Sequence, residues 1–144
     1  MTVEFPPHSF ASTSCVKYLG VQFDPRQRFL EHAKLAAKRA MEAGRCLAQI
    51  LPNLRGAKQR TRRVLSTVVT SRLLYGAPIW AEKMSVKAMA TMESAYRRTM
   101  LRVACCYSTT SYDAAAVVSS MPPLKLLAEE RRSIFLGTNK EVKK

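Results

Sequence analysis

Carboxylates are scarce in this chain of 144 residues, which has 10 Asp and Glu against 24 Lys and Arg. The only aspartates are Asp24 and Asp113, and the only adjacent acidic pair is Glu129–Glu130, which two arginines follow. Catalysis through metal ions or through general acids and bases needs carboxylates that converge on one site. This set offers no such group, so we expect no self-contained active site and no catalytic metal.

Signals for metal binding, cofactor binding and export are also missing. The four cysteines show no C-x-x-C spacing and only two histidines accompany them, which argues against a zinc site and indicates reduced thiols in the nucleus or cytoplasm. There is no glycine-rich phosphate loop, and we expect no cofactor. No apolar run approaches the roughly 18 residues of a membrane-spanning helix. The N-terminal M-T-V-E-F-P-P-H lacks the basic and apolar regions of an export signal.

Positive charge and apolar residues are what the sequence has in excess. The formal net charge is +14, and 47% of the residues are hydrophobic, enough for a core in one domain. So large a positive field around so small a body indicates a polyanionic partner.

The breaks in the apolar periodicity predict a mainly α fold of about four to five helices. We expect an irregular lead-in over residues 1–14, a short strand or hairpin over 15–23, and helices over 26–51, 58–75, 85–104, 114–119 and 123–135. Gly20 in the middle of the strand run indicates a bulge or a close backbone approach. The expected organisation is a lead-in and strand over 1–24, a helical core over 25–107, and short connection helices with a polar tail over 108–144.

Each expected helix has one face that can pack against other helices and one that stays exposed to solvent. The first should pack through Phe29, Ala33, Ala36, Ala40, Ala43 and Leu47 and expose Lys34, Lys38 and Arg45. The second should pack through Ala57, Thr61, Val64, Leu65, Val68 and Tyr75 and expose Arg60, Arg63, Ser66, Thr67 and Thr70. The third should pack through Met89, Met92, Tyr96, Met100 and Val103 and expose Lys87, Arg98 and Arg102.

The helix ends carry their own signals. Gly76 and Pro78 should stop the second helix, and Trp80 should then be buried against it. Arg72, on the packing side, should pair with a carboxylate or a carbonyl group, or extend from the edge of the core into solvent. Thr110 and Asp113 have the spacing of a capping box. The last helix should pack through Leu124, Leu127, Ala128 and Phe135.

Basic residues concentrate between Arg26 and Arg63. This segment has eleven basic and two acidic residues, which gives it a local net charge of +9. A charge run of this kind is either a solvated face or a surface for a phosphate backbone, and the lack of neutralising partners favours the second. The side chains that we expect to contact phosphates are Lys34, Lys38, Arg45, Lys58, Arg60 and Arg63, with Lys87, Arg98 and Arg102 as a competing surface.

Several segments together resemble the end of the reverse transcriptase of non-LTR (LINE-type) retrotransposons. K-Y-L-G-V-Q-F-D at 17–24 resembles the primer-grip segment that closes the palm, and F-L-E-H at 29–32 resembles the start of the thumb. S-R-L-L-Y-G-A-P-I-W, Y-R-R-T-M-L-R-V and P-P-L-K-L-L-A-E-E-R then follow in the family's order and spacing. The resemblance covers roughly residues 15 to 135.

The resemblance implies a fragment of an RNA-directed DNA polymerase, namely the primer-grip strand followed by a helical thumb. Its partners would be the hybrid of RNA template and DNA primer and the missing fingers and palm. Leu19 and Gly20, with Lys17 opening the same segment, would approach the primer backbone. Because the Tyr-x-Asp-Asp turn, the endonuclease and the Cys/His knuckle are absent, we expect no activity from the chain alone.

Two other functions compete with this one. The chain could be an independent helical protein-interaction module that its charge keeps soluble, or it could bind a membrane surface through a basic amphipathic helix. The second is disfavoured because the apolar stripes of the first two helices lack the Trp, Phe and Leu face of such helices.

Overall fold

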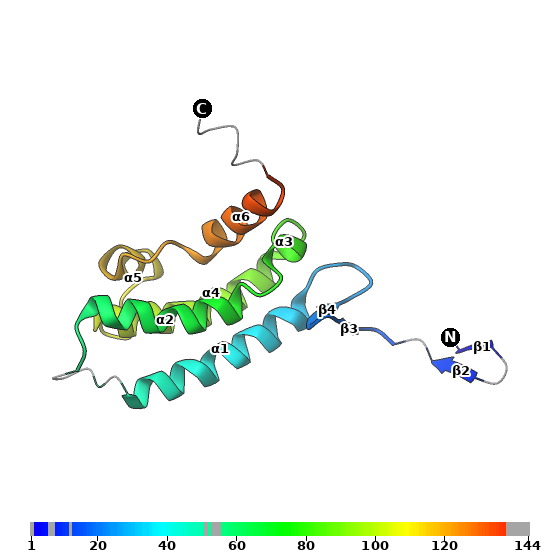
Figure 1. Ribbon diagram of the computed structural model, residues 1–144, viewed down its shortest axis with the longest axis horizontal. Coiled ribbons are helices and arrows are strands. Elements are labelled where there is room, and N and C mark those ends of the chain that lie inside the picture. Colours follow the sequence, from blue (N-terminus) through cyan, green and yellow to red (C-terminus); the bar gives the residue numbers. More distant parts are fainter. Residues whose placement is uncertain (1, 6–7, 12, 51, 53–55, 138–144) are drawn as a thin grey trace.

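The computed structural model describes residues 2–5, 8–11, 13–50, 52 and 56–137 (Figure 1). Its described part is mainly helical and so confirms the predicted fold class. The strands are β1 (Thr2–Phe5), β2 (His8–Ala11), β3 (Val16–Tyr18) and β4 (Val21–Phe23). The helices are α1 (Leu30–Ile50), α2 (Gln59–Leu73), α3 (Ala77–Trp80), α4 (Val86–Ala104), α5 (Tyr112–Ser119) and α6 (Leu124–Phe135). None of the described helices is both long enough and apolar enough to cross a membrane.

The N-terminal segment holds a hairpin where we expected irregular chain. β1 and β2 pair antiparallel with Thr2 opposite Ala11 and Phe5 opposite His8. The prediction for residues 1–14 was wrong because Pro6 and Pro7 were read as breaking the whole segment. Proline removes ladder hydrogen bonds at its own position and leaves the strand-forming residues on either side free to pair.

The second hairpin, β3–β4, confirms the strand or hairpin predicted over 15–23. Leu19 and Gly20 connect its strands with φ angles of 46° and 85°, the positive values that a tight two-residue hairpin turn requires. The Asp24 carboxylate then accepts hydrogen bonds from the backbone N–H groups of Arg28 at 3.0 Å and Phe29 at 2.8 Å. These bonds hold the chain in a turn, which is why α1 begins at Leu30 and not at Arg26.

Helices α1, α2 and α4 pack against one another and form the centre of the molecule (Figure 1). The predicted packing face of α1 is confirmed. Its buried residues are His32, Ala33, Ala36, Ala37, Ala40 and Ala43, and Leu47 is partly buried. Because most of these side chains are small, the neighbouring helices can approach α1 closely.

The packing face of α2 differs from the predicted one. Val64, Val68 and Tyr75 are exposed, and the buried residues are Arg62, Ser66, Val69 and Leu73. Arg62 can be buried because its guanidinium donates hydrogen bonds to the backbone carbonyls of Ala57 at 2.8 Å, Arg102 at 3.5 Å and Pro52. Ser66 likewise donates to the carbonyl of Arg63 at 2.6 Å. Backbone carbonyls thus satisfy both buried polar side chains, of which Ser66 was expected on the exposed face.

The face of α4 is as predicted, since Met92, Tyr96, Met100 and Val103 are buried and Met89 is partly buried.

Two details near the C-terminus are corrected. Ser111, one residue after the predicted Thr110, caps α5 by accepting a hydrogen bond from the Ala114 N–H at 3.3 Å.

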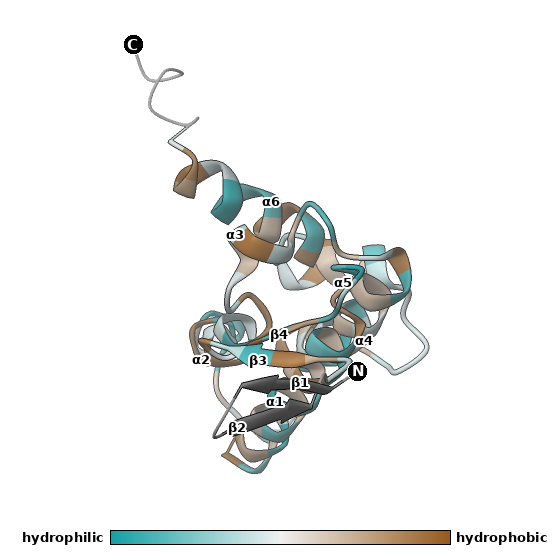
Figure 2. Cartoon of the chain, turned by 90° about the vertical axis from the view of Figure 1, so that its right-hand side faces the viewer, coloured by the Kyte–Doolittle hydropathy of each residue, from teal (hydrophilic) through white to brown (hydrophobic). Residues whose placement is uncertain are grey.

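The second correction concerns α6. It buries Leu124 and Ala128 but leaves Phe135 in its last turn exposed. Figure 2 shows this mixed character as brown and teal residues along α6, beside the largely brown α3.

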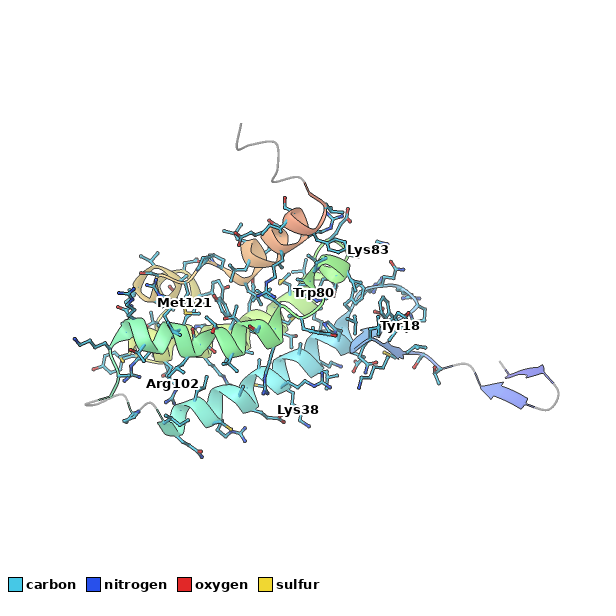
Figure 3. The ribbon with its side chains drawn as sticks, in the orientation of Figure 1. Tyr18, Lys38, Trp80, Lys83, Arg102 and Met121 are labelled. Atoms are coloured by element: carbon cyan, nitrogen blue, oxygen red, sulfur yellow. The ribbon has the colours of Figure 1, made fainter. Side chains whose placement is uncertain are left out.

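Trp80 is fully buried, as predicted. It ends α3, which packs against α6, and its ring lies 6.3 Å from that of His32 in α1 (Figure 3). Its indole N–H donates to the Tyr75 carbonyl at 2.8 Å. Gly76, with φ of 67°, makes the sharp turn between α2 and α3 that places the tryptophan there.

Candidate nucleic-acid interface

The β3–β4 hairpin displays its tip on the surface. Lys17 and Leu19 are exposed, and Leu19 keeps 75% of its surface accessible. The Tyr75 hydroxyl donates to the Leu19 carbonyl at 2.8 Å. A Cβ atom on Gly20 would lie 3.0 Å from Cε1 of the same ring. The close approach predicted at Gly20 is therefore made by a tyrosine of this chain, which fixes the hairpin tip to the end of α2.

The basic residues of α1 lie on its edge towards α4. Lys34, Lys38 and Arg45 are all exposed, and Lys34 forms an ion pair of 2.6 Å with Glu31. Contacts between α4 and Met41 and between α4 and Ala48 mark which edge of α1 faces α4. At 100° per residue, the three cations follow just outside that edge. In Figure 3, Lys38 lies along the outer side of α1, away from α2.

The basic residues of α2 lie on a different side of the helical layer. Lys58, Arg60 and Arg63 are exposed at the start of the helix. Arg72 marks the edge of α2 towards α1, because its guanidinium donates to the Arg39 carbonyl at 3.2 Å, the carbonyl pairing predicted for this arginine. The helical period turns Arg60 and Arg63 away from that edge. These two arginines and the α1 cations therefore do not line one groove.

A pocket of about 240 Å³ opens where α1, α2 and α4 meet, and we call it the arginine pocket. Three exposed arginines surround it, Arg45 from α1 and Arg98 and Arg102 from α4, and the buried Arg62 lies in its wall. Its lining, all of it within the described residues, contains no carboxylate. Figure 3 labels Arg102 in the space between α1 and the layer of α2 and α4.

The sequence pattern did not predict the arginine pocket, although it contained a signal for it. Arg98 and Arg102 stand four residues apart and were assigned to a competing surface on α4. What the pattern could not show is that the edge of α4 bearing them faces the small residues of α1, namely Ala40, Gly44 and Ala48.

A second hollow lies under the β3–β4 hairpin, with Gly20, Arg39, Arg72 and Tyr75 around it and His32 on its inner side. The His32 side chain is buried, accepts a long hydrogen bond of 3.5 Å from the Gln22 N–H, and has its ring 6.3 Å from that of Trp80. Burial lowers the pKa of this imidazole, and the positive charge of Arg39 lowers it further, while the Tyr75 carbonyl opposes both.

Among the described residues, no group of three or more His, Cys, Asp or Glu side chains is placed to hold a metal ion. The cysteines Cys15, Cys46, Cys105 and Cys106 are free thiols.

Comparison with known proteins gives one informative similarity. No family model matches the chain, and no solved structure matches it. The chain is 28% identical over 130 residues to a protein described as a 115 kDa protein in the type-1 retrotransposable element R1DM of Drosophila melanogaster. The similarity covers 89% of this chain and 13% of that relative, so the chain spans about one eighth of the relative's length. It supports an origin related to non-LTR retrotransposons.

Proposed function

We propose that this chain is a non-catalytic module of a retrotransposon reverse transcriptase that binds the RNA template and DNA primer as a hybrid duplex. In this proposal β3–β4 is the primer grip, α1, α2 and α4 form the thumb, and the fingers and palm of the polymerase are its protein partners. The similarity to the R1 element protein and the order of the motifs in the sequence support the origin.

The observation that carries the binding role is positive charge without neutralising partners. The ion pairs within the described residues involve Lys34, Lys125 and Arg132. Lys38, Arg45, Lys58, Arg60 and Arg63 are exposed and take part in none of them. Solvated cations of this kind bind phosphates with release of counterions, independently of base sequence.

The geometry of the hairpin supports the grip. An exposed leucine at a glycine-containing tip can contact a sugar-phosphate backbone closely, and the hydrogen bond from Tyr75 keeps the tip from moving relative to α2. The tip and the helices can then act on one duplex as a rigid unit.

The test is binding of a labelled RNA–DNA hybrid at several salt concentrations. The five exposed cations named above, which lie on two sides of the helical layer, can neutralise at most about five phosphates, and this sets a limit of roughly −4 for the slope of log affinity against log salt. Arg60→Ala with Arg63→Ala should lower affinity for all sequences alike and flatten the slope by up to about 2. Lys125→Ala with Arg132→Ala removes the same charge from two ion-paired residues of α6 and is the matched control.

Affinity that does not depend on salt, or no affinity for the hybrid, would favour an independent protein-interaction module. Metal-dependent primer extension by the purified chain above a control without protein would contradict the non-catalytic assignment.

A further inference from the structure

The three exposed arginines of the arginine pocket have most of their hydrogen-bonding capacity unused. Arg98 contacts the Met41 sulfur at 3.8 Å, and Arg102 donates to the Ala48 carbonyl at 3.4 Å, both long contacts. A guanidinium has five N–H donors. Like charges gathered around one hollow repel one another, and an anion bound among them removes this cost. The arrangement therefore favours an anionic occupant.

The interior of the same pocket is small and mostly apolar, with Ser66 and Thr99 as further lining residues. Its volume of about 240 Å³ lies below the roughly 300 to 1,000 Å³ of pockets for drug-sized ligands. The hollow exists because α1 presents little or no side chain at Ala40, Gly44 and Ala48, opposite the edge of α4 that bears the arginines. The apolar lining consists of Ala40, Met41, Gly44, Leu47, Ala48, Val69, Ala95 and Val103. A flat group of the size of one base fits this interior, and guanidinium planes beside it can stack on the base.

We propose that the arginine pocket binds a single nucleotide, with its phosphate on Arg45, Arg98 and Arg102 and its base against the apolar lining. This inference rests on the proposed nucleic-acid-binding function and adds a site to it. The occupant that fits the function is an unpaired nucleotide of a strand whose neighbouring duplex lies along α1. A free nucleotide shares the same chemistry.

An acidic peptide would also bind arginines, yet it makes no use of the apolar interior. The combination of a cationic rim with a hollow of base size therefore favours the nucleotide.

The first experiment compares a blunt RNA–DNA hybrid with the same hybrid carrying three unpaired adenosines. The extended hybrid should bind the full chain about tenfold more tightly, a gain typical of one added charge-assisted or stacking contact. Adenosine 5′-monophosphate should abolish this gain at concentrations where ribose 5-phosphate does not. If the nucleotide binds and the extension adds nothing, the site takes a free nucleotide and not an unpaired one in a strand.

Two variants test the contacts to the phosphate and the contacts to the base separately. Arg45→Ala with Arg98→Ala should remove the gain from the extension and flatten the salt slope. Gly44→Met should remove the gain and leave the slope for the blunt hybrid unchanged, because it fills the hollow without changing charge. A Cβ at this position would lie 3.9 Å from the nearest Val69 methyl, an ordinary contact, so α1 accepts a side chain there. Thermal unfolding should show both variants folded. Arg60→Ala with Arg63→Ala should keep the gain.

The outcomes distinguish this inference from the function on which it rests. A chain that binds the blunt hybrid but shows neither a gain from the extension nor binding of the mononucleotide has no nucleotide site, and its proposed function stands. A chain that binds no hybrid, yet binds the mononucleotide through Arg45 and Arg98, has the site without the function. Displacement of the extension by polyglutamate, with Gly44→Met behaving as wild type, would assign the pocket to an acidic protein and overturn the inference.

Discussion

The two ends of the α1–α2–α4 layer are built in opposite ways. At the Trp80 end, large side chains fill the interior and leave almost no surface exposed, among them Phe29, Leu73, Leu74 and Trp80. At the other end, alanines and a glycine of α1 face Arg98 and Arg102 of α4 across the arginine pocket, and the charged Arg62 takes the place of an apolar residue. The same three helices thus bury large side chains at one end and enclose a hollow between small residues and arginines at the other.

This difference indicates that one end mainly stabilises the fold and the other mainly serves binding. Dense packing at the Trp80 end fixes the hairpin and the turn into α3, so that the fold is stabilised there by burial of apolar surface. At the arginine pocket, backbone carbonyls hold Arg62 in the wall of the hollow through hydrogen bonds. Substitutions at the first end should therefore act mainly on stability, and those around the second on binding.

The largest expected effect is that of Trp80→Ala. Removing a fully buried indole should lower the free energy of unfolding by roughly 3 to 5 kcal/mol. Urea unfolding followed by circular dichroism measures it, and Ile79→Ala, at an exposed neighbour, should change stability by less than about 0.5 kcal/mol. Unchanged stability of Trp80→Ala together with lost affinity for nucleic acid would contradict the assignment of this end to the core.

Arg62→Met is expected to have the next largest effect. Methionine keeps much of the buried length but leaves the carbonyls of Ala57 and Arg102 without this donor. Loss of hydrogen bonds from a charged donor should lower stability by about 2 to 3 kcal/mol. Arg63→Ala, one residue along the same helix and exposed, is the matched control and should leave unfolding nearly unchanged. Equal effects of the two changes would mean that Arg62 is not part of the folded core.

The same contrast explains how much of the fold the sequence could predict. The face of α1 was found because its alanines and leucines form a single apolar stripe and its opposite side is charged. In α2, Val64 and Val68 form one apolar stripe, and Val69 and Leu73 form another. The second stripe is the buried one, but the charged Arg62 on the same face made it the less plausible choice. Only the carbonyl groups of distant segments make Arg62 acceptable in the interior, and a local pattern contains no information on them.

The candidate site was predictable to the same extent. Exposure of Lys34, Lys38, Arg60 and Arg63 follows from helical period and charge, and the hairpin tip follows from Leu19 and Gly20 in a short strand run. The arginine pocket depends on which edge of α4 meets which edge of α1. That is a tertiary property, which neither helix shows alone.

Gly20→Ala should have a smaller effect, confined to the hairpin. The backbone there has φ of 85°, and the added methyl group would meet the Tyr75 ring at 3.0 Å. Strain at a positive φ costs about 1 kcal/mol. Amide hydrogen exchange should show faster exchange in β3 and β4 and unchanged exchange in α4. Faster exchange throughout the core instead would show that the hairpin and the Trp80 end unfold as one unit.

The smallest expected effect is a pH dependence at His32, next to Trp80. Burial, supported by the charge of Arg39, lowers the pKa of its imidazole in the folded chain below 6.5, so the unfolded chain binds a proton first as the pH falls. The contribution of His32 to the free energy of unfolding is fully present above pH 6.5. It decreases as the pH falls from there towards the folded-state pKa. One group can contribute at most about 1.4 kcal/mol for each pH unit. His32→Gln keeps an acceptor for the Gln22 N–H and does not titrate, so its stability should lose this slope between pH 6.5 and pH 5. A slope that persists in His32→Gln and disappears in His8→Gln would assign the titration to the other histidine. It would also remove the imidazole from the account of how the Trp80 end is stabilised.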